Sequence, residues 1–284
     1  MQVNTRKIKS IVGNGTTSPT IYATPNKRVF GFQLGLIYAG GTNTLAALMT
    51  ALTAIVVKVG TIEKWNLTGT KLRDFMLLHG TTFDFNGLPN TGCQVTIPLA
   101  PEWFFASVQD GLAWNPQRLG GAISVELTST AALTVVAREM TADNLDADSF
   151  GIMTLEVIKP IAASTSFVVE KEIEIRGRIL SLSIYPDSGG SQEITPVSLY
   201  LGDNDVLHHE ALTSAENDEA LERMALTPAA SGRTANIYDI VPVKNDMLAR
   251  SIDLMLWKKA KLDIGAAVAM TGTCDILIAR LEDR

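Results

Sequence analysis

The sequence presents the same order of elements twice, at a spacing of half the chain. Residues 135–138 read VVAR and residues 277–280 read LIAR, 142 residues further along a chain of 284. Gly60 and Gly202 each follow an apolar alternating segment and are also 142 residues apart. In each half, two alternating segments lead to a short amphipathic stretch, a stretch with a tryptophan and two closing alternating segments. This repetition predicts a chain built from two copies of one plan.

Alternation of apolar residues with other residues, the period of a pleated strand, dominates both halves. It is clearest from Phe30 to Tyr38 and from Leu180 to Ile184. Many short strands separated by Gly, Pro, Asn and Asp favour sandwiches over alternating strand–helix units. We therefore expect an all-β fold of two tandem jelly-roll sandwiches (a double jelly roll) with a few short helices. The stretches with helical spacing are 45–52, 70–80 and 214–224.

A polar, acidic stretch at 141–151 marks the join between the halves. Each half then has roughly 140 residues, which is enough for its own core and for an eight-stranded sandwich. We expect a basic N-terminal arm over residues 1–19, a first jelly roll over 20–148 and a second over 149–284.

The charge distribution is uneven. The chain carries a formal net charge of −6, which argues against general binding of nucleic acid. The first 62 residues nevertheless contain no Asp or Glu, and Arg6, Lys7 and Lys9 make their beginning basic. Two interpretations stay open here. The segment is either a solvated terminus or a contact for an anionic surface such as lipid head groups.

Residues suited to catalysis are sparse. The three histidines are His79, His208 and His209, and His208-His209-Glu210 is the only cluster of ligand-type residues. Adjacent histidines on a strand point to opposite faces, so they cannot bind one metal ion as a His-x-His pair does. The sequence has no nucleophile elbow, no Walker loop and no dinucleotide-binding glycine motif in the right context. We expect no catalytic residue and no organic cofactor.

Two acidic residues, Asp203 and Asp205 in the stretch GDNDV, are candidate calcium ligands. They lack the full ligand count of a calcium loop, and a solvated turn is the alternative. Cys93 and Cys274 belong to no metal-binding motif and are interpreted as buried thiols.

Two segments resemble a known family. The segment VVKVGTIEKWNLTGTKLRDFM (56–76) is similar to part of the first barrel of double jelly-roll major capsid proteins. The segment RILSLSIYPDSGGSQEITPVSLYLGD (178–203) resembles the corresponding part of their second barrel. The family members in question are the small capsid proteins of icosahedral bacteriophages with an internal membrane, of the corticovirus and tectivirus lineage. The resemblance runs from about residue 20 to the C-terminus as an order and length of elements.

This resemblance implies a structural protein without enzymatic activity. Three chains would form a pseudo-hexagonal homotrimer, and many trimers would tile an icosahedral shell over a lipid membrane. The N-terminal segment would lie on the inner side, with Arg6, Lys7 and Lys9 facing the membrane. Further implied partners are neighbouring trimers and minor capsid and vertex proteins, without direct sequence-specific binding of nucleic acid. The location would be the virion, after synthesis in the host cytoplasm.

Two other classes remain open from the residues alone. A carbohydrate-binding, lectin-like double sandwich fits the fold, but it would require exposed aromatics in a groove and a secretion signal. The sequence does not begin with a recognisable secretion signal. A two-domain cupin enzyme would require histidine ligands in both halves, and the first half has only His79. Glycan binding would support the former, and a stoichiometric metal ion the latter.

Overall fold

The computed structural model divides into two compact units. The first comprises Met1–Met76, Thr81–Leu155 and Asp283–Arg284, and the second comprises Leu77–Gly80 and Glu156–Glu282. The residues that the structure describes are 4–12, 20–38, 45–80, 92–101, 106–130, 132–143, 151–158, 169–185, 194–211, 213–227, 233–234, 236–242, 251–266 and 274–282.

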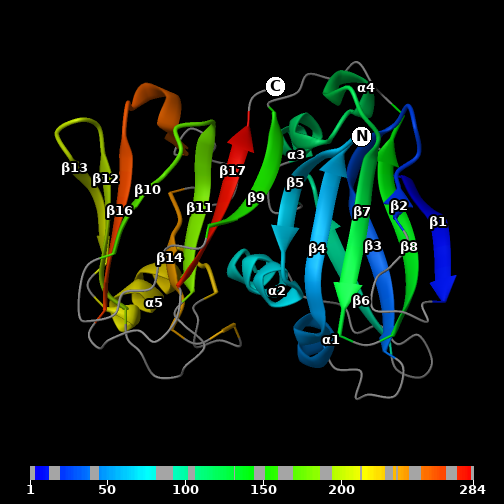
Figure 1. The fold of residues 1–284 in the computed structure, drawn as a ribbon, viewed down its shortest axis with the longest axis horizontal. Coiled ribbons are helices and arrows are strands. Elements are labelled where there is room, and N and C mark those ends of the chain that lie inside the picture. The colour runs from blue at the N-terminus through cyan, green and yellow to red at the C-terminus, as the bar shows by residue number, and fades with distance from the viewer. Residues whose placement is uncertain are drawn as a thin grey trace. The chain divides into compact units, whose positions relative to one another are not determined.

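The first unit is built from two runs of hydrogen-bonded strands (Figure 1). One run has the order β1-β8-β3-β6 and the other the order β2-β7-β4-β5. The pairs within both runs are antiparallel. The strands are β1 (Asn4–Val12), β2 (Ile21–Tyr22), β3 (Arg28–Tyr38), β4 (Leu52–Val59), β5 (Ile62–Leu67), β6 (Gly92–Pro98), β7 (Ile123–Ser129) and β8 (Leu133–Ala142).

The second unit has the same plan. Its runs have the orders β9-β17-β11-β14 and β10-β16-β12-β13, and the short strand β15 pairs with β11 outside this plan. The strands are β9 (Ile152–Ile158, whose residues up to Leu155 belong to the first unit), β10 (Val169–Glu172), β11 (Arg178–Tyr185), β12 (Ile194–Leu201), β13 (Val206–Ala211), β14 (Tyr238–Ile240), β15 (Ile252–Asp253), β16 (Ala260–Ala266) and β17 (Asp275–Glu282).

Strand order identifies both units as jelly rolls. With the eight main strands numbered within each unit, both units have the orders 1-8-3-6 and 2-7-4-5. This is an eight-stranded sandwich in which the first strand pairs with the last. The expected double jelly roll, mostly β with short helices, is confirmed.

The duplication extends to the irregularities of the strands. β3 and β11 both start at an arginine, and in both the ladder to the last strand of the unit shifts one residue after that arginine. β4 and β12 also share a shift in their hairpin ladders, followed by a glycine with a left-handed φ of +60° at Gly60 and +80° at Gly202. The shifted pairs are Val29/Gly31, Ile179/Ser181, Val57/Lys58 and Leu199/Tyr200.

One of these shared bulges changes a sequence-based expectation. The bulge in β11 places Ile179, Leu182 and Ile184 in the core, so the alternation expected from Leu180 holds only beyond the bulge.

The VVAR and LIAR tetrapeptides lie in equivalent strands, β8 and β17, but not at equivalent positions. Because Arg178 pairs with Leu281 where Arg28 pairs with Ala142, equivalent residues of these strands are 139 apart rather than 142. An odd shift exchanges the faces of a strand. Accordingly Arg138 is exposed and Arg280 is buried.

Residues 4–12 require a correction, because we expected them to belong to a separate basic arm over 1–19. They form β1, which pairs with β8 at the edge of its sheet. Backbone hydrogen bonds along an open strand edge do not need apolar alternation in the partner, so the basic sequence of β1 hid this strand. In the ladder, Arg6 lies opposite Glu139, Lys7 opposite Arg138 and Lys9 opposite Ala137.

The three expected helices are present, and the structure adds others. Helix α5 is capped by Thr213, whose hydroxyl accepts the Glu216 backbone N–H at 3.1 Å. The helices are α1 (Leu45–Ala51), α2 (Gly69–Leu78), α3 (Ala106–Leu112), α4 (Pro116–Leu119), α5 (Ser214–Arg223) and a 3₁₀ helix (Leu254–Leu256), of which α3, α4 and the 3₁₀ helix were not expected.

Each unit has its own core. In the first, the Trp65 and Trp114 rings meet edge to face at 6.5 Å between centroids, and the Trp65 indole N–H donates to the Met153 carbonyl at 2.9 Å. In the second, aliphatic side chains of both strand runs interdigitate. Examples are Ile184 and Ile278 from one run and Leu199 and Leu262 from the other.

Candidate functional site

The histidines do not form a site in the part of the chain that the structure describes. His79 follows the end of α2, where burial, with a smaller contribution from the Arg233 charge, lowers its pKa to about 3. His208 lies exposed on β13. The structure describes only the backbone of His209 and Glu210. Within the described ranges, no three His, Cys, Asp or Glu side chains are grouped closely enough to hold a metal ion.

The calcium candidates lie in the turn between β12 and β13, where each contacts a lysine. Asp203 is 3.6 Å from the ammonium group of Lys258, and Asp205 is 3.1 Å from that of Lys259. These ammonium groups already neutralise the carboxylates. A divalent cation would have to displace them, so the turn is better suited to cross-linking two segments of the chain than to binding calcium.

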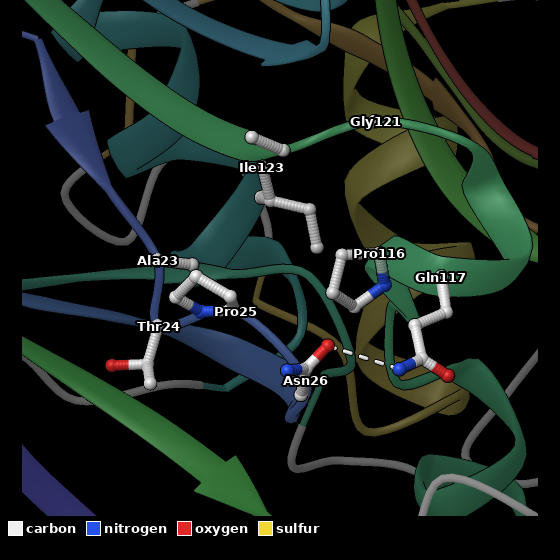
Figure 2. A pocket seen from close by; sticks show the side chains of 9 residues that line it. Ala23, Thr24, Pro25, Asn26, Pro116, Gln117, Gly121 and Ile123 are labelled. Carbon is white, nitrogen blue, oxygen red and sulfur yellow. Dashed lines mark hydrogen bonds between the residues drawn. The ribbon is translucent and has the colours of Figure 1, made fainter.

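A hollow of about 210 Å³ opens in the first unit between the segment after β2 and the segment that contains α4 (Figure 2). Pro25 and Pro116 lie on its two sides, and Asn26 joins them by accepting a hydrogen bond from the Gln117 amide at 2.9 Å. Its lining contains no carboxylate, histidine or cysteine. The hollow therefore lacks the groups needed for acid–base or metal chemistry.

An arginine–aspartate pair recurs at the equivalent arginines of the two units. Arg28 at the start of β3 is buried and contacts Asp110 of α3, its guanidinium Nη2 lying 2.5 Å from the carboxylate. Arg178 at the start of β11 contacts Asp253 of β15 at 3.2 Å. In both units the aspartate comes from the connection between the sixth and seventh main strands. The pair therefore ties that connection to the sandwich.

The second unit contains a fully buried charged network. The Arg233 guanidinium donates two hydrogen bonds to Asp239, at 2.8 and 2.9 Å, and both side chains are fully buried. The Ser183 hydroxyl donates to the same carboxylate at 2.5 Å. Asn217 of α5 donates to the Asp239 carbonyl at 2.8 Å and accepts its N–H at 3.0 Å. This network joins β11, β14 and α5, and we read it as structural.

A second buried arginine of the second unit, Arg280, lies in β17. The Arg280 Nη1 donates to the carbonyls of Glu174 and Arg176, at 3.0 and 3.1 Å, and its Nε is 3.3 Å from the Glu156 carboxylate. Burial lowers the pKa of Arg280. The pairing fixes the segment between β10 and β11 against the last strand.

The large exposed apolar side chains of the described residues lie on a few segments. They occupy the start of β13 and the 3₁₀ helix, while the first unit exposes Tyr22 on β2 and Ile62 at the start of β5. Ile62 and Val206 occupy equivalent hairpin positions, each opposite the last residue of the preceding strand. The exposed apolar residues of the second unit are Val206, Leu207, Met255, Leu256 and Trp257.

The buried charged network around Asp239 was not expected from the sequence. Asp239 and Arg233 belong to no recognisable motif, and a buried partner is not visible from spacing. The exposed Met255-Leu256 pair is likewise a plain apolar pair in the sequence. Of the membrane candidates Arg6, Lys7 and Lys9, the structure describes the backbone only. No helix among the described residues is both long and apolar enough to span a bilayer.

Comparison with known proteins gives matches at the level of structure. No protein-family model and no curated protein matches the sequence. The major capsid protein P2 from Bacteriophage PM2 aligns with a TM-score of 0.76 at 12% identity, over 100% of this chain and 99% of that one.

Two further matches involve PBCV-1. A quasi-atomic model of the PBCV-1 virus capsid has a TM-score of 0.62 at 10% identity, covering 98% of this chain and 93% of that chain. PBCV-1 VP54, fitted into a reconstruction of the virophage Sputnik, also has a TM-score of 0.62, at 11% identity and with the same coverage. These capsid structures do not favour the lectin-like alternative. Over its whole length, the chain has the double jelly-roll fold seen in these virus capsid proteins.

Proposed function

We propose that this chain is a viral major capsid protein that assembles with copies of itself into a shell. The observation that carries the proposal is the full-length match to the P2 capsid protein of PM2, with both jelly rolls in the same chain. In this role the protein is structural and has no catalytic activity, and its location is the virion after synthesis in the host cytoplasm.

The proposed building block is a homotrimer. One chain supplies two sandwiches with the same strand order and the same bulges. Three such chains around a threefold axis present six similar sandwiches, which gives a block with a nearly hexagonal outline. Blocks of this outline tile a surface, as an icosahedral shell requires. Minor capsid and vertex proteins would complete that shell.

Contact with an internal membrane is the finer part of the proposal. Arg6, Lys7 and Lys9 lie on β1, an edge strand, rather than on a free arm, so a membrane would meet a basic sheet edge. Each basic residue near an anionic lipid surface contributes on the order of 1 kcal/mol. Replacing all three with alanine should abolish sedimentation with phosphatidylglycerol vesicles at low salt, and unchanged sedimentation would refute this contact.

Calcium remains an untested candidate at Asp203 and Asp205. Since Lys258 and Lys259 contact these carboxylates, we expect the melting temperature measured with calcium to equal that measured with a chelator. A calcium-dependent rise that is lost on Asp205→Asn would establish the site instead.

The test of the proposed function is the mass of the purified chain in solution. Light scattering at micromolar concentration should give a stable species at three times 30.6 kDa. A monomer at every concentration, with no particles under shell-forming conditions, would refute the capsid role.

A further inference from the structure

The second unit exposes apolar side chains on two neighbouring segments, the start of β13 and the segment of the 3₁₀ helix, and we call this region the apolar tip: Val206, Leu207, Met255, Leu256 and Trp257. Met255 is 66% exposed and Leu256 80% exposed, so most of both side chains faces outward. Val206 and Leu207 are adjacent on β13 and point to opposite faces of the strand, so only one of them can share a surface with Met255, Leu256 and Trp257. Exposed apolar patches of a few hundred Å² mark interaction sites.

The apolar tip is held in place by its neighbours. The Gly202 N–H donates to the Lys259 carbonyl at 2.8 Å, which ties the β12–β13 turn to the segment after the 3₁₀ helix. A Cβ on Gly202 would lie 3.3 Å from the Trp257 ring, so the indole packs over this glycine. The Asp253 carboxylate accepts the Met255 N–H at 3.1 Å and caps the 3₁₀ helix. A surface ordered in advance loses little entropy on binding.

The rim of the apolar tip is charged but balanced. Lys258 is paired with Asp203 and Lys259 with Asp205, as described above. An anionic membrane attracts surfaces with an excess of basic residues, and this rim has none. An apolar centre within a polar rim is the usual anatomy of a protein–protein interface.

Strand geometry also favours a protein over lipid. Val206 and Leu207 lie on β13, which is the last strand of its run and has β12 as its only strand neighbour among the described residues (Figure 1). The outer edge of such a strand presents backbone N–H and C=O groups. Hydrocarbon cannot satisfy these groups, whereas a protein partner can.

We propose that the apolar tip is a contact between copies of this chain, occupied by a second copy in the assembled state. This assignment rests on the proposed capsid function, which requires repeated contacts between identical chains. The contact removes Leu256 and Met255 from water. A stable interface buries about 800 Å² per partner, so the contact must extend over the polar rim as well.

The experiment compares wild type with the double variant Met255→Ser, Leu256→Ser. Both side chains project into solvent, so the fold should be unaffected, which circular dichroism and the melting temperature check. Tyr22→Ser is the control, because Tyr22 is 61% exposed on the first unit and lies on β2, away from the hairpin position equivalent to that of Val206. Association is measured by sedimentation over a dilution series, and vesicle binding is measured on phosphatidylcholine–phosphatidylglycerol vesicles.

We expect the double variant to associate at least about tenfold more weakly than wild type and the control. Association equal to wild type would overturn the inference while leaving the capsid role intact. Equal weakening by Tyr22→Ser would overturn it as well, because general loss of apolar surface would then be the cause. Loss of vesicle binding with unchanged association would assign the apolar tip to lipid. A wild type that never associates would contradict the capsid role itself.

Discussion

Replacing Asp239 with asparagine should destabilise the second unit severely while hardly changing its shape. The carboxylate accepts three hydrogen bonds, two from Arg233 at 2.8 and 2.9 Å and one from Ser183 at 2.5 Å. Asparagine keeps the volume but removes the charge and turns one acceptor into an NH₂ donor. The guanidinium of Arg233 would then remain as a buried charge without its counter-ion.

The magnitude follows from the complete burial of both partners. Removing one member of a fully buried ion pair costs about 3–5 kcal/mol, because the remaining charge cannot return to water. An exposed pair loses at most about 1 kcal/mol. Asp205, whose carboxylate is 42% exposed beside Lys259, provides the matched control.

The assay is urea unfolding followed by circular dichroism at fixed protein concentration. We expect Asp239→Asn to lower the free energy of unfolding by about 3–5 kcal/mol and Asp205→Asn by less than about 1 kcal/mol. The double variant Arg233→Met, Asp239→Leu should recover part of the loss, since it removes both charges. A change below about 0.5 kcal/mol for Asp239→Asn would show that the pair is not held in a water-free site.

Three further predictions concern single groups. The His79 pKa of about 3 lies below that of the unfolded chain, so the unfolded chain binds a proton first as the pH drops below 6.5. The free energy of unfolding should therefore fall by up to about 1.4 kcal/mol per pH unit in this range. His79→Gln should flatten that part of the urea-derived pH profile, and an unchanged slope would contradict the assignment. Gly60→Ala and Gly202→Ala should each cost about 1 kcal/mol in urea unfolding because both have left-handed φ, and a cost at only one would argue against equivalent turns. Burial raises the Cys274 pKa to about 11, so in a Cys93→Ser background iodoacetamide should label it at pH 8 only after unfolding; rapid labelling of the folded chain would contradict its burial.

Much of the architecture could be predicted from the sequence because it depends on local periodicity. Alternation of apolar residues marks one face of each strand, and the glycines at 60 and 202 mark turns whose φ only glycine adopts readily. The order of these signals in both halves was enough for a double jelly roll. β1 could not be found in this way, since its pairing with β8 uses backbone groups and its sequence is basic. The bulges escaped as well, because one extra residue in a strand has no fixed sequence signature.

One unexpected helix, α4, has end signals that are visible in the sequence. α4 carried readable signals, namely Asn115 as a cap that accepts from the N–H groups of Gln117 and Arg118, Pro116 at the first position and Gly120 in the left-handed region. Its brevity concealed it, because four residues show no apolar period.

The buried network around Asp239 is beyond sequence reasoning for a different reason. Its partners come from β11, β14 and α5, and a pair is recognised only when the fold brings these elements together. The apolar tip is similar, since exposure rather than composition distinguishes Leu256 from a core leucine.

The most direct test of the proposed capsid role is electron cryomicroscopy of the purified oligomer. We predict a particle with one threefold axis and six sandwich-shaped densities in a nearly hexagonal ring, two from each chain. A particle without a threefold axis, or a monomer with two sandwiches alone, would contradict the account.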